Sequence, residues 1–175
     1  MLFRSIAARA WQLHTPNKAL GLPGVRAGWL QAPATATRHL VAMVDALAAS
    51  WVLSAEGVVL LEAATEPAVQ AWLADARHTL QTWGQAQRQQ LEALGWTLPA
   101  SVCPFGLARP DGPAAAVPAR LARLREAGVK LRDARSFGLP GWVRLSTQSP
   151  EAQAALVAAW RLRPGDTLAP TPHRP

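Results

Sequence analysis

The sequence predicts a mixed α/β protein of 175 residues, with an α+β arrangement in its second half. After the first ninety-odd residues, strand and helix patterns alternate in the order strand, helix, strand, strand, helix. This order is typical of a layer of helices on an antiparallel or mixed sheet. The first half is mainly helical in pattern and contains a single strand, so the two halves are expected to differ in architecture.

The first half is predicted to contain one strand, over residues 25–30 (VRAGWL), which enters an Ala-Pro pair. A lone strand cannot form a sheet, and we expect the rest of this chain to supply no partner for it. Residues 36–64 are predicted to form one long helix or two joined helices, with Gly57 as the expected break.

A further long helix is predicted to follow. Thr65 is the expected N-cap, Pro67 falls in the first turn, and Gly95 is expected to end the helix just after Leu94. Apolar residues recur along it at the three- and four-residue spacing of a buried helix face. They are Val69, Trp72, Leu73, Ala76, Leu80, Trp83, Leu91 and Leu94.

The elements of the second half are shorter and are separated by Pro and Gly. Two helices are expected, one ending at Gly128 and one capped by Ser149 with Pro150 at its first position. The expected strands are two short ones around Pro99, followed by VKLRD (129–133) and WVRLS (142–146).

Composition narrows the range of partners. The formal net charge is +7, and residues 1–44 contain no Asp or Glu. The basic residues are isolated among Gly and Pro rather than arranged in runs, which favours anionic small ligands over nucleic acid. The most apolar stretch, 40–64, is interrupted by acidic residues, so no membrane span is expected.

Cys103 is the only cysteine. A single thiol excludes an internal disulfide and a cysteine metal cluster, and we expect no bound metal. It is expected to be a small buried apolar residue rather than a nucleophile, and the cytoplasm is the expected compartment.

Lys18 stands among Ala, Leu, Gly and Pro with no acidic neighbour. A lysine shielded from water loses its proton more readily, and a neutral amine is the form that attacks a carbonyl. Thr15 and Arg26 offer a hydroxyl and a guanidinium suited to phosphate oxygens. An amine for an aldehyde and these groups for a phosphate form the set that pyridoxal phosphate requires. From composition alone, a surface lysine in a Gly/Pro turn is the alternative.

Two motifs in this sequence resemble those of a known family. TPNKALGLPGVRAGW (15–29) closely resembles the Schiff-base lysine motif of fold-type I pyridoxal-phosphate enzymes, the class I/II aminotransferase superfamily. LREAGVKLRDARSFGLPGWVRLSTQSPEAQAAL (124–156) resembles the small domain of the same family. The form of both motifs is similar to the threonine-phosphate decarboxylase branch of cobalamin biosynthesis, a relative of histidinol-phosphate aminotransferase. The resemblance covers nearly all of residues 5–163.

The resemblance implies a role for each polar residue of the two motifs. Lys18 would hold pyridoxal 5′-phosphate covalently, and Thr15 and Arg26 would bind the cofactor's phosphate. Arg144 would take a substrate anion, most simply the carboxylate.

Two further arginines, Arg132 and Arg135, lie near the same turn and could hold a substrate phosphate. Three arginines in a turn rich in Gly and Pro also suit a dianion on physical grounds. The alternative is that Arg132 forms a surface ion pair with Asp133 or another neighbour.

The implied activity is decarboxylation of L-threonine O-3-phosphate to aminopropanol phosphate. A histidinol-phosphate-type aminotransferase and a non-catalytic remnant domain are the alternatives. Family members are about twice as long and form homodimers, so the chain is expected to be a C-terminal fragment lacking half of the active site. We expect residues 1–55 to be a remnant of the cofactor-binding large domain, 56–163 the small α+β domain, and 164–175 a disordered tail.

Overall fold

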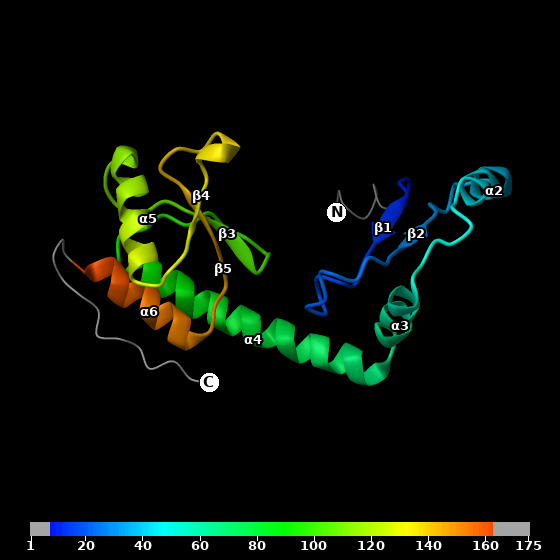
Figure 1. Ribbon diagram of the computed structural model, residues 1–175, viewed down its shortest axis with the longest axis horizontal. Coiled ribbons are helices and arrows are strands. Elements are labelled where there is room, and N and C mark those ends of the chain that lie inside the picture. The colour runs from blue at the N-terminus through cyan, green and yellow to red at the C-terminus, as the bar shows by residue number, and fades with distance from the viewer. Residues whose placement is uncertain (1–7, 163–175) are drawn as a thin grey trace. The chain divides into compact units, whose positions relative to one another are not determined.

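The computed structural model describes residues 8–162, and the chain divides into two compact units, Met1–Ala76 and Arg77–Pro175. The division falls inside helix α4 (Pro67–Glu92), whose first part belongs to one unit and whose remainder belongs to the other. The first unit holds a two-stranded ribbon and helices α2 and α3, and the second holds a three-stranded sheet with α5 and α6 (Figure 1).

The ribbon of the first unit pairs β1 (Gln12–His14) antiparallel with β2 (Trp29–Gln31). The strand predicted over 25–30 therefore begins later than expected, and the expectation that it has no partner within this chain is wrong. The rings of His14 and Trp29, which face each other in the register, stack with centroids 5.1 Å apart. A three-residue strand this close to the start of the chain was too short to be recognised from alternation.

Of the two alternatives predicted over 36–64, the structure has two helices, α2 (Arg38–Ala46) and α3 (Ala55–Ala63), and not one long helix. Each begins at a hydroxyl N-cap, Thr37 or Ser54, whose side chain accepts a hydrogen bond from the amide three residues on. Gly57 lies inside α3 rather than at the break. An added Cβ there would come within 3.3 Å of the Ala27 Cβ, so this glycine allows close packing against the chain before β2.

Helix α4 ends as the sequence predicts. Gly95 has a φ of +79°, its amide donates to the Glu92 carbonyl at 2.9 Å, and the Trp96 amide donates to the Leu91 carbonyl at 3.1 Å. These are the two bonds of a Schellman motif. At the other end the expected role of Thr65 is not observed, because its hydroxyl donates backwards to the Glu62 carbonyl.

The second unit is a small α+β layer, as predicted. Its antiparallel sheet has the order β3-β5-β4, with the longest register between β3 and β5. The elements are β3 (Phe105–Ala108), η1 (Ala114–Ala116), α5 (Val117–Glu126), β4 (Arg132–Asp133), η2 (Arg135–Phe137), β5 (Val143–Ser146) and α6 (Pro150–Arg161). Of the two short strands predicted around Pro99, β3 is the later one, and the earlier one is reduced to a single bridge between Thr97 and Arg109.

The core of this unit lies on one face of the sheet. Val143 and Leu145 of β5 are buried there, whereas Arg144 and Ser146 alternate to the other face. Helices α4, α5 and α6 cover the buried face through Leu91, Val117, Leu121, Leu124, Leu156 and Ala159, together with Trp96 just after α4. The opposite face is thereby left free to carry polar side chains.

Three further expectations concern the cysteine, the C-terminal tail and membrane-spanning helices. Cys103 is exposed rather than buried, because it lies in the loop that leads to β3 and not in a strand. The expected tail, 164–175, lies outside the described residues. Within residues 8–162, no helix combines the length and the apolar character needed to cross a bilayer.

Candidate functional site

The loop between β1 and β2, residues 15–28, carries the Lys18 motif. Two side chains tie its ends together. The Thr15 hydroxyl donates to the Ala27 carbonyl at 2.8 Å and lies 3.1 Å from Asn17 Oδ1. The Asn17 side-chain amide donates to the Val25 carbonyl at 3.2 Å, and Asn17 is the buried polar residue of this loop. The loop is therefore closed by its own side chains.

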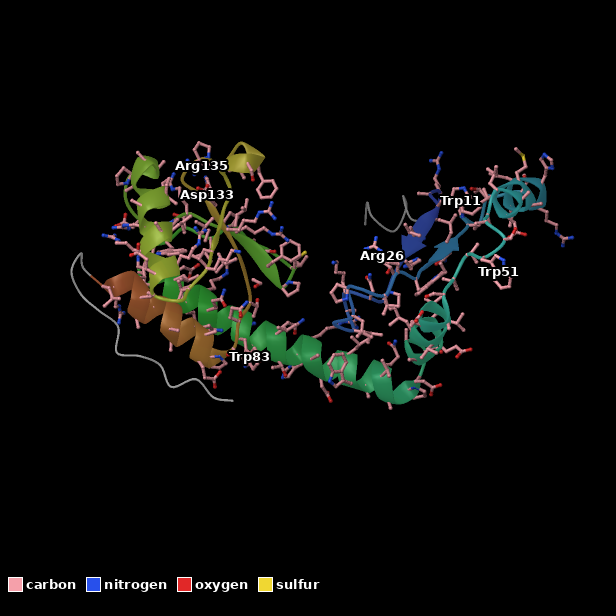
Figure 2. The ribbon with its side chains drawn as sticks, viewed as in Figure 1. Trp11, Arg26, Trp51, Trp83, Asp133 and Arg135 are labelled. Atoms are coloured by element: carbon pink, nitrogen blue, oxygen red, sulfur yellow. The ribbon has the colours of Figure 1, made fainter. Side chains whose placement is uncertain are left out.

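These ties bring the candidate cofactor residues to neighbouring positions. Lys18 directly follows Asn17, and Arg26 directly follows Val25, so both stand beside the same hydrogen bond. Figure 2 shows Arg26 on the chain that leads into β2. Among residues 8–162, neither Lys18 nor Arg26 takes part in an ion pair. The Lys18 amine and the Arg26 guanidinium of this closed loop are therefore both without an acidic partner among the described residues.

Lys18 is exposed, which differs from the shielded amine that the sequence predicts. The loop beyond Lys18 is also open, since an added Cβ at Gly21 or Gly24 would meet nothing within 4 Å.

The residues of the loop fit pyridoxal phosphate in kind. The lysine amine suits the aldehyde and the Arg26 fork suits the phosphate, whereas the Thr15 hydroxyl would have to exchange its bond to the Ala27 carbonyl before donating to a phosphate oxygen. Gly28 is required by the ribbon itself, since a Cβ there would collide with the His14 carbonyl oxygen. The glycine thus fixes the close approach of β1 and β2 at the base of the loop.

Arg132 and Arg144 come together on the second unit. They are direct partners in the antiparallel pair β4–β5, on the face of the sheet turned away from the core. Arg144 lies on the central strand and is half-buried, whereas Arg132 lies on the edge strand and is exposed. Like charges directly opposite each other destabilise a sheet, so this pair indicates a place for an anion.

Each guanidinium of the pair rests on its own phenyl ring. Arg144 Cζ lies 4.6 Å from the centroid of Phe105, and Arg132 Cζ lies 4.7 Å from that of Phe137. Both rings are about half exposed. Stacking holds the planar groups in place while leaving their N–H donors available for an anion.

Arg135 is engaged differently from the pair. Its Nε donates to Asp133 Oδ2 at 2.7 Å, and its backbone amide donates to Asp133 Oδ1 at 2.9 Å (Figure 2). The nearest carboxylate in sequence therefore binds Arg135 and not Arg132. The surface ion pair considered for Arg132 and Asp133 is not formed, and within the described part of the chain Arg132 and Arg144 have no acidic partner.

Comparison with known proteins decides the family. A sequence model of the class I and II aminotransferases matches residues 12–159, which is most of the chain. The protein belongs to the class I and II aminotransferase family. Both the ribbon with its Lys18 loop and the small sheet with its arginine pair lie inside the matched region. Membership implies pyridoxal phosphate as the cofactor.

Three known proteins that resemble this chain are each matched over only part of their own length. It is 30% identical to histidinol-phosphate aminotransferase from Rhodopseudomonas palustris over 85% of this chain and 39% of that protein. The same identity holds for the enzyme of that name from Rhodospirillum rubrum, over 80% and 37%. L-threonine-O-3-phosphate decarboxylase from Porphyromonas gingivalis shares the fold, with a TM-score of 0.57 and 24% identity over 85% of this chain and 45% of that one. The chain thus spans less than half the length of these relatives.

Sequence reasoning missed the residues that support the site. Asn17 stands in the lysine motif, but its neighbours gave no sign that it is buried and bonded across the loop. Phe105 and Phe137 occupy a strand start and a turn, where a single aromatic residue has many roles. Only the pairing of β4 with β5 reveals that Arg132 faces Arg144.

Proposed function

We propose that this chain is the lysine-bearing part of a pyridoxal-phosphate enzyme that acts on a phosphorylated amino acid. The observation that supports this most directly is the Asn17–Val25 hydrogen bond, which joins the chain positions next to Lys18 and Arg26 across one closed loop. Pyridoxal phosphate carries both an aldehyde, which Lys18 would bind, and a phosphate, which Arg26 would bind.

Each residue of the loop has a distinct task in this proposal. Lys18 supplies the amine that bonds to the cofactor's aldehyde carbon. Arg26 donates a fork of hydrogen bonds to the phosphate, and Thr15 lines the same phosphate. Bound pyridoxal phosphate supplies an electron sink for the electron pair released when a bond to the substrate's α carbon breaks.

The arginines of the second unit are proposed to hold the substrate. Arg144, half-buried and stacked on Phe105, takes the carboxylate. Arg132 takes the substrate phosphate from the opposite strand. Arg135 contributes to the phosphate through the N–H groups that Asp133 leaves free. Two separate anions on one substrate account for opposed, unpaired guanidinium groups.

The specific reaction we propose is decarboxylation of L-threonine O-3-phosphate to aminopropanol phosphate in cobalamin biosynthesis. It is supported by the form of the two motifs, Pro-Asn-Lys-Ala-Leu-Gly-Leu around Lys18 and Ser-Phe-Gly-Leu-Pro-Gly before Arg144. A substrate with a carboxylate and a phosphate also matches two unpaired arginines better than a substrate with one anion.

A histidinol-phosphate-type aminotransferase is the second candidate. One observation favours it: the curated relatives at 30% identity carry the name histidinol-phosphate aminotransferase. Both candidates use the same lysine and a phosphorylated substrate. They differ in whether the carboxylate or the α hydrogen of the substrate is lost.

We take the domain organisation, compartment and oligomeric state in this proposal from the family. Residues 1–55 belong to the cofactor-binding domain and 56–163 to the small domain of a cytoplasmic enzyme that is a homodimer at full length. The chain binds neither nucleic acid nor membrane in this proposal.

Product analysis tests the proposed reaction. The longest native polypeptide that carries this chain is incubated with pyridoxal phosphate and L-threonine O-3-phosphate, with Lys18→Ala as the control. We expect carbon dioxide and aminopropanol phosphate in equal amounts, and neither from the variant. Histidinol phosphate consumed with a 2-oxo acid as amino acceptor would establish the second candidate instead. No turnover of either substrate would leave the non-catalytic remnant and overturn the proposal.

A further inference from the structure

A buried glutamine joins the helical layer of the second unit to the strand that carries Arg144. Gln87 of α4 is only 7% exposed, although its side chain ends in a polar amide group. Its Nε2 donates to the Ser146 carbonyl at 3.1 Å, and its Oε1 accepts from the Gln148 amide at 2.9 Å. The side-chain amide therefore bonds the backbone on both sides of Thr147, as a neighbouring strand would.

The surroundings hold this contact in one geometry. An added Cβ at Gly84, one turn earlier on α4, would come within 3.3 Å of Thr147 Oγ1, so the helix and the segment after β5 are in close contact. On the other side, the Thr147 amide donates to the Pro104 carbonyl at 2.8 Å. Thr147 is fixed between the helix and the loop before β3.

A second glutamine completes the network. Gln153 of α6 donates from Nε2 to the carbonyls of Trp83 and Gln148, at 2.9 and 2.8 Å, and its Oε1 accepts from Gln90 at 3.1 Å. Gln153 thus links α6 directly to α4, and it also bonds the carbonyl of Gln148, whose amide bonds Gln87. A buried amide network with every partner present specifies a single arrangement, because any shift leaves a polar group unpaired.

The end of β5 sets the position of Arg144. Ser146 is the last residue of β5, and Arg144 lies two positions earlier on the same face of the sheet. Phe105, on which the Arg144 guanidinium rests, is the cross-strand partner of Ser146. A shift of the Ser146 backbone would therefore move both the arginine and its supporting ring.

We propose that Gln87 is a positioning residue for the Arg132–Arg144 anion site, acting through its two bonds to the backbone around Thr147. The inference rests on the proposed function only in taking this arginine pair as an anion site. The amide is needed as both donor and acceptor, so a carboxylate cannot replace it whereas a protonated carboxylic acid can.

Sulfate binding by the full chain tests the proposal, because sulfate stays a dianion over the pH range in which a buried carboxyl titrates. The affinity for sulfate and the NMR resonance of the Arg144 Nε–H are compared in wild type, Gln87→Leu and Gln87→Glu. Gln89→Leu, an exposed change on the same helix, is the matched control, and Leu156→Val controls for a loss of core stability.

We expect Gln87→Leu to weaken sulfate binding by roughly tenfold and to move the Arg144 resonance, since small misplacements of a binding group are costly. Gln87→Glu should behave in the same way at neutral pH and regain both properties on acidification. General destabilisation would not be reversed by acid, so this recovery distinguishes it from a positioning role. The Gln87→Glu variant also provides the test if Gln87→Leu does not fold. Both control variants should keep wild-type affinity.

Wild-type sulfate affinity and an unmoved Arg144 resonance in folded Gln87→Leu would overturn the positioning role. The proposed function fails in a different way: sulfate binding by wild type would be absent or unaffected by Arg144→Gln. In that event the Arg144 resonance in the Gln87 variants still decides whether this glutamine positions the arginine.

Discussion

Arg132 and Arg144 face each other as cross-strand partners on the open face of the small sheet, and the one carboxylate in that stretch binds Arg135 instead. Two unpaired guanidinium groups in this register repel each other. Anions bound by these groups would offset the repulsion and gain charge-assisted hydrogen bonds. We therefore expect bound anions to stabilise the second unit.

Replacing Arg132 should remove the effect of anions on the free energy of unfolding. In Arg132→Gln we expect the free energy of unfolding without added anion to change by no more than about 0.5 kcal/mol, because relief of repulsion and loss of the Phe137 contact offset each other. The increase that sulfate produces in wild type should be lost. Urea unfolding with and without sulfate measures both values. Arg123→Gln, an exposed change on α5, is the control, and an equal sulfate effect in both variants would refute the anion site.

Arg26 should determine cofactor affinity. Losing charge-assisted hydrogen bonds to the phosphate costs about 1.5–3 kcal/mol, so Arg26→Gln should bind pyridoxal phosphate roughly 10- to 100-fold more weakly. Thr15→Ser should keep the affinity and Thr15→Val should lower it, since only serine retains the hydroxyl. Absorbance titration gives the dissociation constants. Arg38→Gln at the start of α2 is the matched control, and a similar loss there would show that net charge alone is responsible.

Gly28 should be necessary for the ribbon that closes the Lys18 loop. In Gly28→Ala the new methyl group would collide with the His14 carbonyl, which is backbone and cannot move without breaking the β1–β2 pairing. Hydrogen exchange of the amides in 12–14 and 29–31 should become much faster. Gly24→Ala, where the methyl group meets nothing within 4 Å, should leave the exchange rates unchanged. Identical exchange in the two variants would contradict the observed register.

The elements that the sequence predicted best are those with local signals. The end of α4 at Gly95 and the start of α6 at Ser149 follow from the glycine and hydroxyl residues at those positions. The strand predicted over 142–146 is confirmed as β5, Val143–Ser146. The candidate site residues followed from two motifs rather than from these patterns.

What could not be predicted depends on contacts between distant residues. Strand β1 exists because Gly28 allows it to approach β2, and three residues are too few to show a period. The break between α2 and α3 follows from the cap at Ser54, whereas Gly57 only resembled a break. The role of Gln87 depends on a backbone segment almost sixty residues away, which no local pattern encodes.

Ser149 should stabilise the start of α6 through its cap. Ser149→Ala should lower the free energy of unfolding by about 1 kcal/mol. The Ser149 hydroxyl, followed by the Glu151 backbone amide, lowers the pKa of Glu151 below the ordinary 4.5. A lowered folded-state pKa adds stability above the unfolded-state value and loses it as pH falls through the folded-state value. The difference between wild type and variant should therefore shrink on acidification.

NMR titration of the Glu151 carboxyl and unfolding at several pH values measure these effects together. In Ser149→Ala the Glu151 pKa should rise toward its ordinary value. Ser136→Ala, in an exposed turn, is the control and should change neither quantity. A pKa for Glu151 that is the same in wild type and Ser149→Ala would show that the hydroxyl does not reach the carboxylate.

Whether Lys18 holds the cofactor can be tested by chemical labelling, because Lys18 and Lys130 are the only lysines in the sequence. The chain is mixed with limiting pyridoxal phosphate and reduced with borohydride, and the modified peptides are quantified by mass spectrometry. We predict that label appears at Lys18 in wild type and in Lys130→Arg, and that Arg26→Gln loses most of it. Equal labelling of Lys18 and Lys130, unchanged in Arg26→Gln, would contradict the account.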